Sequence, residues 1–367
     1  MILQIINYYL YYVSFQAQHI PLQVPKEYTQ KYLTLYEEGW DVLRNNRLNA
    51  ARDKGLFPLD APIVDSLSSL KKWEEIDGQR KKFLIKSAAV FAGMLNAMDF
   101  HIGRLVSYLK ENDLYENTIF IVTADNGPEG NNPEEHQAWR SWIGTTSYTR
   151  NIDTLGEENS YVFIGTEFAQ AMASPHHMFK FHMNEGGLKV PLIMSGNGIT
   201  KGVYSEFTYL TDIAATISKI ITGEVPERMI GKSLEQVLRG SLEKVYEENE
   251  YIGLEVAGNS ALFKGDYKIL KNGPPTGDDI WHLYNLADDP GETNDLAKQK
   301  PDIFQQLLKH YDEYVADNGV IDLGPDYYWA TEMTVNTAKR RFAEFIPSLI
   351  FIILIIGLIV IVYIRRR

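Results

Sequence analysis

An uncharged run, FIPSLIFIILIIGLIVIVYI, extends from Phe345 to Ile364 and restricts the folds open to this chain. About 20 apolar residues are what an α-helix needs to cross a hydrocarbon core of ~30 Å, so we predict a transmembrane helix here and not a buried core helix. Pro347 is expected in the first turn of that helix, where its missing N–H costs little. The sequence therefore predicts a single-pass membrane anchor.

Basic side chains flank the anchor on both sides, in a predicted linker over 331–344 and in a tail over 365–367. Because both flanks are basic, the positive-inside rule does not fix the orientation of the helix. The three terminal arginines lie closest to the apolar run and favour a cytoplasmic tail.

The composition permits an enzyme without requiring one. The 367 residues include 45% hydrophobic side chains, enough for one large α/β domain or two medium ones. A net charge of -12 argues against a nucleic-acid binder, which normally shows a basic face. Since there is no cysteine, the chain has no disulfide, no thiolate metal site and no cysteine nucleophile.

The first fifteen residues, MILQIINYYLYYVSF, lack the positive charge and the small-residue cleavage site of a signal peptide. We therefore predict a buried strand at the start of the chain, with residues 8–15 as an interior strand. This strand would lead into the segment QAQHIPLQVP and put His19 in a loop at a sheet edge.

A helix and a strand are predicted next. Apolar side chains recur every three or four residues from 91 to 109, which indicates a helix that packs one face on a sheet and ends near 111–113. A predicted strand over 119–123 follows, and its polar end is typical of open α/β sheets, where ligands lie beyond the carboxyl ends of strands. Residues 128–160 are expected to form a long loop, and PLIMSG another buried strand.

A second unit is predicted from Tyr251 onward. ALFKGDYKIL has the pattern of a hairpin that turns at 264–266, and WHLYNL that of a further strand. Residues 300–317 are expected to form an amphipathic helix. We therefore expect a small antiparallel sheet with a terminal helix over 251–330, separate from a main core over 1–250.

Four residues carry candidate chemistry. Asp125 and Asn126 follow the predicted strand and offer hard oxygen ligands that suit Ca²⁺ or Mg²⁺, although Asp-Asn-Gly is also a common turn. Lys180, which precedes a Glu-Gly-Gly at 185–187, is either a partner for an oxyanion or a surface lysine. His19 is either a general acid or a solvated loop residue.

The histidines His176, His177 and His182 raise the question of zinc. Their spacing is not the i, i+4 pair with an intervening glutamate of zinc hydrolases, so we predict no zinc site. No Gly-rich phosphate loop, nucleophile elbow or dinucleotide fingerprint is present in the sequence either.

Five segments in order resemble the sulfatase family over residues 8–320, most closely its bacterial arylsulfatase branch. They are FQAQHIPLQVP, MLNAMDFHIGRLVSYLKENDLYENT, IFIVTADNGPEG, K-x4-EGG-x-x-VP and WHLYNLADDPGETNDLA. The resemblance implies an alkaline-phosphatase-like α/β fold, with a mixed sheet flanked by helices and a small C-terminal antiparallel subdomain. It also implies hydrolysis of sulfate esters at a Ca²⁺ site by a formylglycine made from cysteine or serine.

The resemblance gives each candidate residue a role. Asp125 and Asn126 match the family's metal-binding aspartate and asparagine, Lys180 its sulfate-binding lysine, and His19 the histidine near the leaving-group oxygen. A divalent cation and an ammonium would neutralise charge that develops on the sulfate, while a histidine would protonate the departing oxygen. An exoplasmic or periplasmic catalytic domain is expected, as in other membrane-tethered sulfatases.

One motif of the family, the nucleophile-bearing C/S-x-P/A-x-R, does not occur in the printed sequence. We therefore expect the C-terminal portion of a membrane-anchored arylsulfatase-like enzyme, without the N-terminal part of its core and inactive by itself. The alternatives are a phosphoesterase of the same superfamily and a non-catalytic, membrane-tethered module that binds anionic ligands. The oligomeric state is left open.

Overall fold

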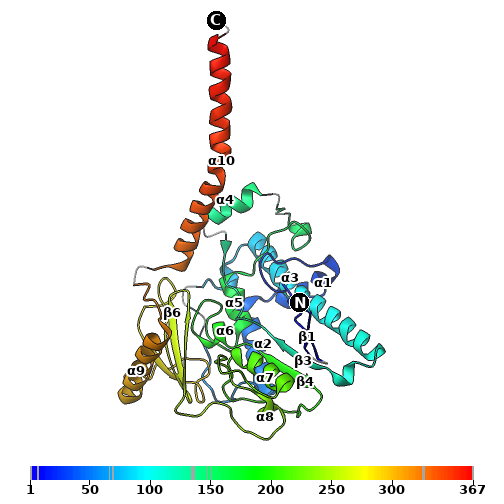
Figure 1. The fold of residues 1–367 in the computed structure, drawn as a ribbon, viewed down its shortest axis with the longest axis vertical. Coiled ribbons are helices and arrows are strands. Elements are labelled where there is room, and N and C mark those ends of the chain that lie inside the picture. Colours follow the sequence, from blue (N-terminus) through cyan, green and yellow to red (C-terminus); the bar gives the residue numbers. More distant parts are fainter. Residues whose placement is uncertain are drawn as a thin grey trace.

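A computed structural model describes residues 2–5, 8–65, 67, 70–133, 137–146, 148–149, 151–324 and 327–365. Figure 1 shows a body of helices and small sheets from which one long helix projects. The helices are α1 (Lys26–Gln30), η1 (Leu33–Tyr36), α2 (Gly39–Asp53), η2 (Trp73–Glu75), α3 (Gly78–Glu111), η3 (Tyr115–Asn117), α4 (Gln137–Thr145), η5 (Ile152–Thr154), α5 (Gly165–Ala173), α6 (Glu185–Leu188), α7 (Thr211–Thr222), α8 (Glu235–Leu238), α9 (Pro301–Asn318) and α10 (Trp329–Arg365). The strands are β1 (Ile2–Ile5), β2 (Tyr8–Tyr11), β3 (Ile119–Thr123), β4 (Leu192–Gly196), β5 (Tyr251–Val256), β6 (Asn259–Lys264), β7 (Tyr267–Lys271) and β8 (His282–Asn285).

The strand that leads to the candidate metal ligands, β3, pairs antiparallel with β4 in a two-stranded sheet. Both strands lie where the sequence predicts them, but the expected mixed sheet of buried strands is wrong. The sheets of the described residues are all antiparallel, and Val122 and Ile193 are 38% and 60% exposed. An apolar strand is buried only where other layers cover both of its faces, and the local sequence carries no information about those layers.

The start of the chain forms an antiparallel hairpin, in which Ile5 of β1 lies opposite Tyr8 of β2. The predicted strand over 8–15 is confirmed only for Tyr8–Tyr11, and its interior location is wrong, since Tyr9 and Tyr11 are 61% and 60% exposed. Tyrosine suits an exposed pleated face as well as a buried one, so composition alone does not distinguish the two. His19 lies in the loop that follows, as predicted.

The main hydrophobic core is built by α1, α2, α3 and α5 around aromatic side chains. Asp77 caps the start of α3, because its carboxylate accepts hydrogen bonds from two backbone N–H groups at 3.0 Å each. The end of this helix at Glu111 confirms the prediction, whereas its main contacts are with α1 and η1 and not with a sheet. Its buried residues lie in its first half, so Leu95 and Leu105 of the predicted apolar face are exposed.

The second unit agrees with its prediction. Strands β5 to β8 form a four-stranded antiparallel sheet in chain order, and α9 packs against it. The hairpin of β6 and β7 turns at Gly265 and Asp266, as expected. Leu262, Ile269 and Leu283 of the sheet are fully buried against Leu307 of α9. The division of the chain at residue 250 stays a prediction.

Two helices differ from the expectations. The predicted loop over 128–160 contains α4. The apolar run belongs to the longer helix α10, which begins at Trp329, so the predicted linker is helical and Pro347 lies inside the helix and not in its first turn. Residues such as Glu332, Met333 and Lys339 favour helix, which extends α10 toward the body of the protein.

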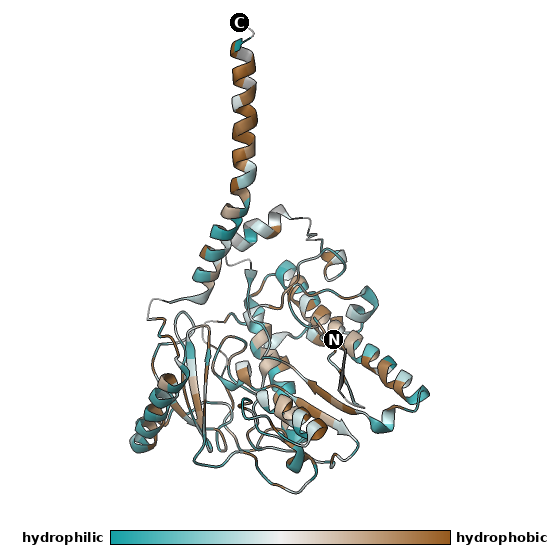
Figure 2. Cartoon of the chain, in the orientation of Figure 1, coloured by the Kyte–Doolittle hydropathy of each residue, from teal (hydrophilic) through white to brown (hydrophobic). Residues whose placement is uncertain are grey.

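By length and composition, α10 is able to cross a membrane, and none of its most apolar window is buried in the body. Figure 2 shows the apolar stretch in the part of α10 that projects away. Helix α3 passes the same test, yet 39% of its window is buried and it serves as a core helix. Arg366 and Arg367 of the predicted tail lie outside the described residues.

Candidate active site

The loop after β3 presents the two predicted metal ligands. Asp125 is exposed, and among the described residues no hydrogen bond or ion pair engages its carboxylate. The side-chain amide of Asn126 donates from Nδ2 to the carbonyl of Gly127 at 2.9 Å, so Oδ1 is the atom that remains for a cation. A carboxylate and an amide oxygen therefore lie side by side at the end of the strand.

These oxygens fit a hard divalent cation in kind, but they are too few to hold one alone. Ca²⁺ takes about 6–8 oxygen ligands, and this pair supplies about two or three. Within the described ranges, no group of three or more histidine, cysteine, aspartate or glutamate side chains is arranged to bind a metal. We therefore derive no catalytic step through a metal ion.

Backbone hydrogen bonds join this loop to the Lys180 segment. The N–H of Gly127 donates to the carbonyl of Gly187 at 2.9 Å, and the N–H of Lys180 donates to the carbonyl of Pro128 at 3.0 Å. The approach is so close that a Cβ on Gly127 would lie 1.9 Å from the carbonyl oxygen of Gly186. The glycines of the two motifs thus let two segments far apart in sequence meet at one place.

Three side chains converge at this junction. The ammonium of Lys180 lies 3.3 Å from Nε2 of His19 and donates to Oε2 of Glu129 at 3.2 Å. Nε2 of His19 lies 3.5 Å from the same Glu129 oxygen. The side chains of Lys180 and Glu129 are 15% and 11% exposed, whereas that of His19 is 55% exposed. The charged groups of Lys180 and Glu129 are therefore largely buried, whereas the His19 ring is open to solvent.

The hydrogen bonds of His19 define which ring nitrogen carries the proton. Nδ1 lies 2.8 Å from the carbonyl oxygen of Ile20, which only accepts, so Nδ1 is protonated. In the neutral ring, Nε2 then accepts from the ammonium of Lys180. A second proton on Nε2 would face Glu129 and the open side, where a leaving oxygen could receive it.

Of the predicted site residues, the structure places His19 and Lys180 in contact, and it places Asp125 and Asn126 in the loop that also carries Glu129. Glu129 was not among the site residues predicted from the sequence. The only signal was its position in the ADNGPEG loop, four residues after Asp125.

Two of the three clustered histidines have side-chain hydrogen bonds, whereas Nδ1 of His177 is buried with no partner among the described residues. His176 donates from Nδ1 to the carbonyl of Pro290, and His182 bonds the carbonyl of Phe179 and the hydroxyl of Thr276. Burial lowers the pKa of all three, to about 4 for His177, so they are neutral near pH 7.

A buried ionic triad connects the Lys180 segment to the second unit. Lys268 of β7, with a side chain 0% exposed, donates to Glu185 at 2.8 Å and to Glu292 at 2.7 Å. Glu185 belongs to the Glu-Gly-Gly of the Lys180 segment, and Glu292 to the DDPGE turn of the second unit. The triad therefore links two motifs that the sequence shows only as separate segments.

The described residues thus bring the Lys180 ammonium and the His19 imidazole together, beside the loop that carries the oxygens of Asp125 and Asn126. The profile of the family described as sulfatase matches residues 9–223, and that of the N-sulphoglucosamine sulphohydrolase C-terminal region matches residues 175–317. The chain belongs to the sulfatase family, which confirms the recognition made from the five segments.

Known proteins resemble the chain over part of their own length. An uncharacterized sulfatase of Schizosaccharomyces pombe is 34% identical over 336 residues, which cover 86% of this chain and 59% of the relative. An arylsulfatase of Klebsiella aerogenes is 27% identical over 228 residues, or 60% of this chain and 47% of the relative. A solved structure in complex with its substrate D-glucosamine-2-N,6-O-disulfate is 18% identical, with a TM-score of 0.47, over 76% of this chain and 46% of that one. The chain thus spans less than two thirds of the length of each.

Proposed function

We propose that this chain supplies the sulfate and leaving-group contacts of a sulfatase centre that hydrolyses sulfate esters at a Ca²⁺ site. The observation that carries the proposal is the contact of Lys180 with both His19 and Glu129, beside the loop of Asp125 and Asn126. Family membership supports a sulfate ester over the phosphate ester of the alternative phosphoesterase.

In this proposal the Lys180 ammonium binds the sulfate group first, and His19 protonates the leaving oxygen afterwards. The sulfate group takes the place of Glu129 as a partner of the Lys180 ammonium, and the displaced carboxylate faces His19. When a nucleophile that these residues do not supply bonds to the sulfur and the ester S–O bond breaks, an imidazolium at His19 donates its Nε2 proton to the departing alkoxide or phenoxide. Asp125 and Asn126 would hold Ca²⁺, which neutralises charge on the sulfate oxygens when it is bound.

Because the printed residues contain no C/S-x-P/A-x-R motif, we expect the chain to bind an aryl sulfate without turning it over. Calorimetry with 4-nitrophenyl sulfate and CaCl₂ tests this expectation. Lys180→Ala should weaken binding by about 10-fold or more, since a charge-assisted hydrogen bond contributes about 1.5–3 kcal/mol. Lys201→Ala, at an exposed lysine outside the site, should bind like the parent chain.

Absence of binding to the parent chain, or equal binding by Lys180→Ala, would contradict the proposed site. Sustained release of nitrophenolate by the 367-residue chain would contradict only the expected lack of turnover.

We further propose that α10 anchors the protein in a membrane, with the body on the exoplasmic or periplasmic side. Its uncharged stretch and exposed apolar side chains support this proposal. The full chain should float with liposomes and resist alkaline extraction, whereas Leu354→Arg with Leu358→Arg should weaken retention. Complete alkaline release of the parent chain would refute the anchor.

A further inference from the structure

The first turns of α10 lie against the candidate site. We call residues 329–334 the foot of α10. The ring of Trp329 in the foot stacks on Phe181, with centroids 4.3 Å apart and an interplanar angle of 19°. Phe181 follows Lys180 directly, and the Lys180 ammonium lies 5.4 Å from the centroid of the Phe181 ring. The projecting helix is thus one aromatic contact away from the proposed sulfate-binding lysine.

The backbone of Phe181 needs such support. Its φ of 77° lies in the left-handed region, which is rare for a bulky side chain and unfavourable without support. Two contacts from distant parts of the chain hold it. Asn259 of β6 donates from Nδ2 to the carbonyl of Phe181 at 2.7 Å, and Trp329 covers the ring. The direction of the neighbouring Lys180 side chain depends on this conformation.

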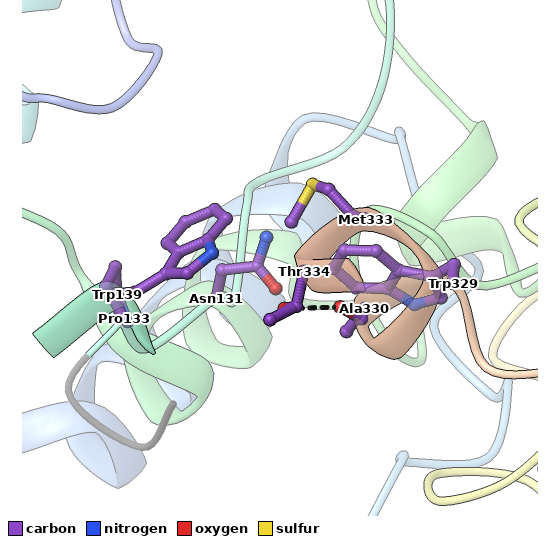
Figure 3. A pocket seen from close by; sticks show the side chains of 7 residues that line it. All are labelled: Asn131, Pro133, Trp139, Trp329, Ala330, Met333 and Thr334. Atoms are coloured by element: carbon purple, nitrogen blue, oxygen red, sulfur yellow. Dashed lines mark hydrogen bonds between the residues drawn. The ribbon is translucent and has the colours of Figure 1, made fainter. Parts of the chain in front are cut away.

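The foot also lies near Asn131, which is hydrogen-bonded to Glu129. Asn131 donates from Nδ2 to Oε1 of Glu129 at 2.6 Å, and the other oxygen of this carboxylate accepts from Lys180. Figure 3 shows Asn131 facing the foot of α10. The two border a cavity of about 10 Å³, roughly the space of one water molecule, whose lining residues are Asn131, Pro133, Trp139, Trp329, Ala330, Met333 and Thr334. Asn131 and the foot thus line the same small cavity.

We propose that Trp329 is a positioning residue for the Lys180 and Glu129 pair, so that the anchor helix is a structural part of the site. The inference rests on the proposed function in one respect, because its affinity measurement requires that the chain bind a sulfate ester. In the membrane-anchored protein, α10 would then hold the site away from the bilayer. Sixteen residues separate Trp329 from Phe345, which at 1.5 Å per residue corresponds to a height of about 24 Å.

The test compares the full, detergent-solubilised chain with Trp329→Leu, which keeps apolar volume but removes the stack, and with Trp329→Phe, which restores an aromatic ring. Phe342→Ala is the matched control, an aromatic residue of α10 that is 65% exposed. Two readouts are needed: amide hydrogen exchange at Lys180 and Gly186, and affinity for 4-nitrophenyl sulfate. Thermal midpoints establish that each variant is folded.

An aromatic stack contributes about 0.5–1.5 kcal/mol, which corresponds to roughly 2- to 12-fold in an equilibrium constant. We therefore expect Trp329→Leu to speed exchange at Lys180 and to weaken binding by such a factor, with recovery in Trp329→Phe and no change in Phe342→Ala. Exchange and affinity equal to those of the parent chain would overturn the positioning role. If the parent chain does not bind the probe, the proposed function fails, and unchanged exchange in Trp329→Leu still decides against the positioning role.

Discussion

The buried triad of Lys268, Glu185 and Glu292 makes a quantitative prediction for Lys268→Met. The substitution keeps most of the side-chain volume but leaves two carboxylates without their shared cation. Removal of one partner from a buried ion pair typically costs about 3–5 kcal/mol. We expect Lys268→Met to lose that amount of unfolding free energy at pH 7.5.

The pH dependence sharpens this prediction. Burial raises the pKa of Glu292 from 4.5 to about 6, despite the attraction of Lys268, a shift that corresponds to about 2 kcal/mol. Since the folded state binds this proton more tightly, the contribution of Glu292 is fully present below about pH 4.5 and is lost as pH rises through 6. Burial also opposes the charge of Glu185, but attraction by Lys268 and Lys189 outweighs it and lowers its pKa.

In Lys268→Met both carboxylates lose this attraction, so their pKa values should rise and protonation should relieve the defect. The destabilisation should therefore fall by about half between pH 7.5 and pH 5. Guanidinium unfolding of the full chain in detergent measures it at both values. Lys271→Met, at the end of the same strand, removes a half-exposed ion pair with Asp279 and should cost less than about 1 kcal/mol. Equal losses in both variants, or a Lys268→Met loss that does not change with pH, would refute the reasoning.

Three further predictions concern the junction of the site. Gly127→Ala should destabilise the chain by about 2–3 kcal/mol in guanidinium unfolding, because its Cβ meets the Gly186 carbonyl. Gly103→Ala, in open space on α3, should instead stabilise it by about 0.5–1 kcal/mol. Glu129→Gln should tighten 4-nitrophenyl sulfate binding several-fold in calorimetry, since it removes the competing charge beside Lys180; weaker binding would show that Glu129 assists the anion. CaCl₂ should raise the thermal midpoint of the parent chain but not of Asp125→Ala, and an equal rise in both would place the ion elsewhere.

Local patterns in the sequence identify several elements correctly. The alternation and turn residues of the β6–β7 hairpin and the helical periodicity of α9 are complete within short segments, so they could be predicted. The exposure of Tyr9 and Ile193 could not, because it depends on which layers cover the strands. The early start of α10 at Trp329 was missed because the apolar run marks the part suited to a membrane and not the whole helix.

In the site, too, local sequence identifies some residues and misses those that depend on contacts between distant segments. Asp125, Asn126, Lys180 and His19 are recognisable because they occur in segments with a known order, although their roles as ligands and catalytic groups stay predictions. Glu129 was missed because its partner Lys180 lies 51 positions away, and only the folded chain shows that the two side chains meet. The Lys268 triad is likewise invisible in the sequence, since no local pattern indicates a fully buried lysine.

The central claim is that Lys180 and His19 bind the sulfate group of an ester. An experimental structure of the full chain with 4-nitrophenyl sulfate and CaCl₂ tests it most directly. We expect the sulfate within hydrogen-bond distance of the Lys180 ammonium, with the bridging oxygen toward Nε2 of His19 and Glu129 displaced from Lys180. A sulfate bound elsewhere, with the contact of Lys180 and Glu129 intact, would contradict the claim.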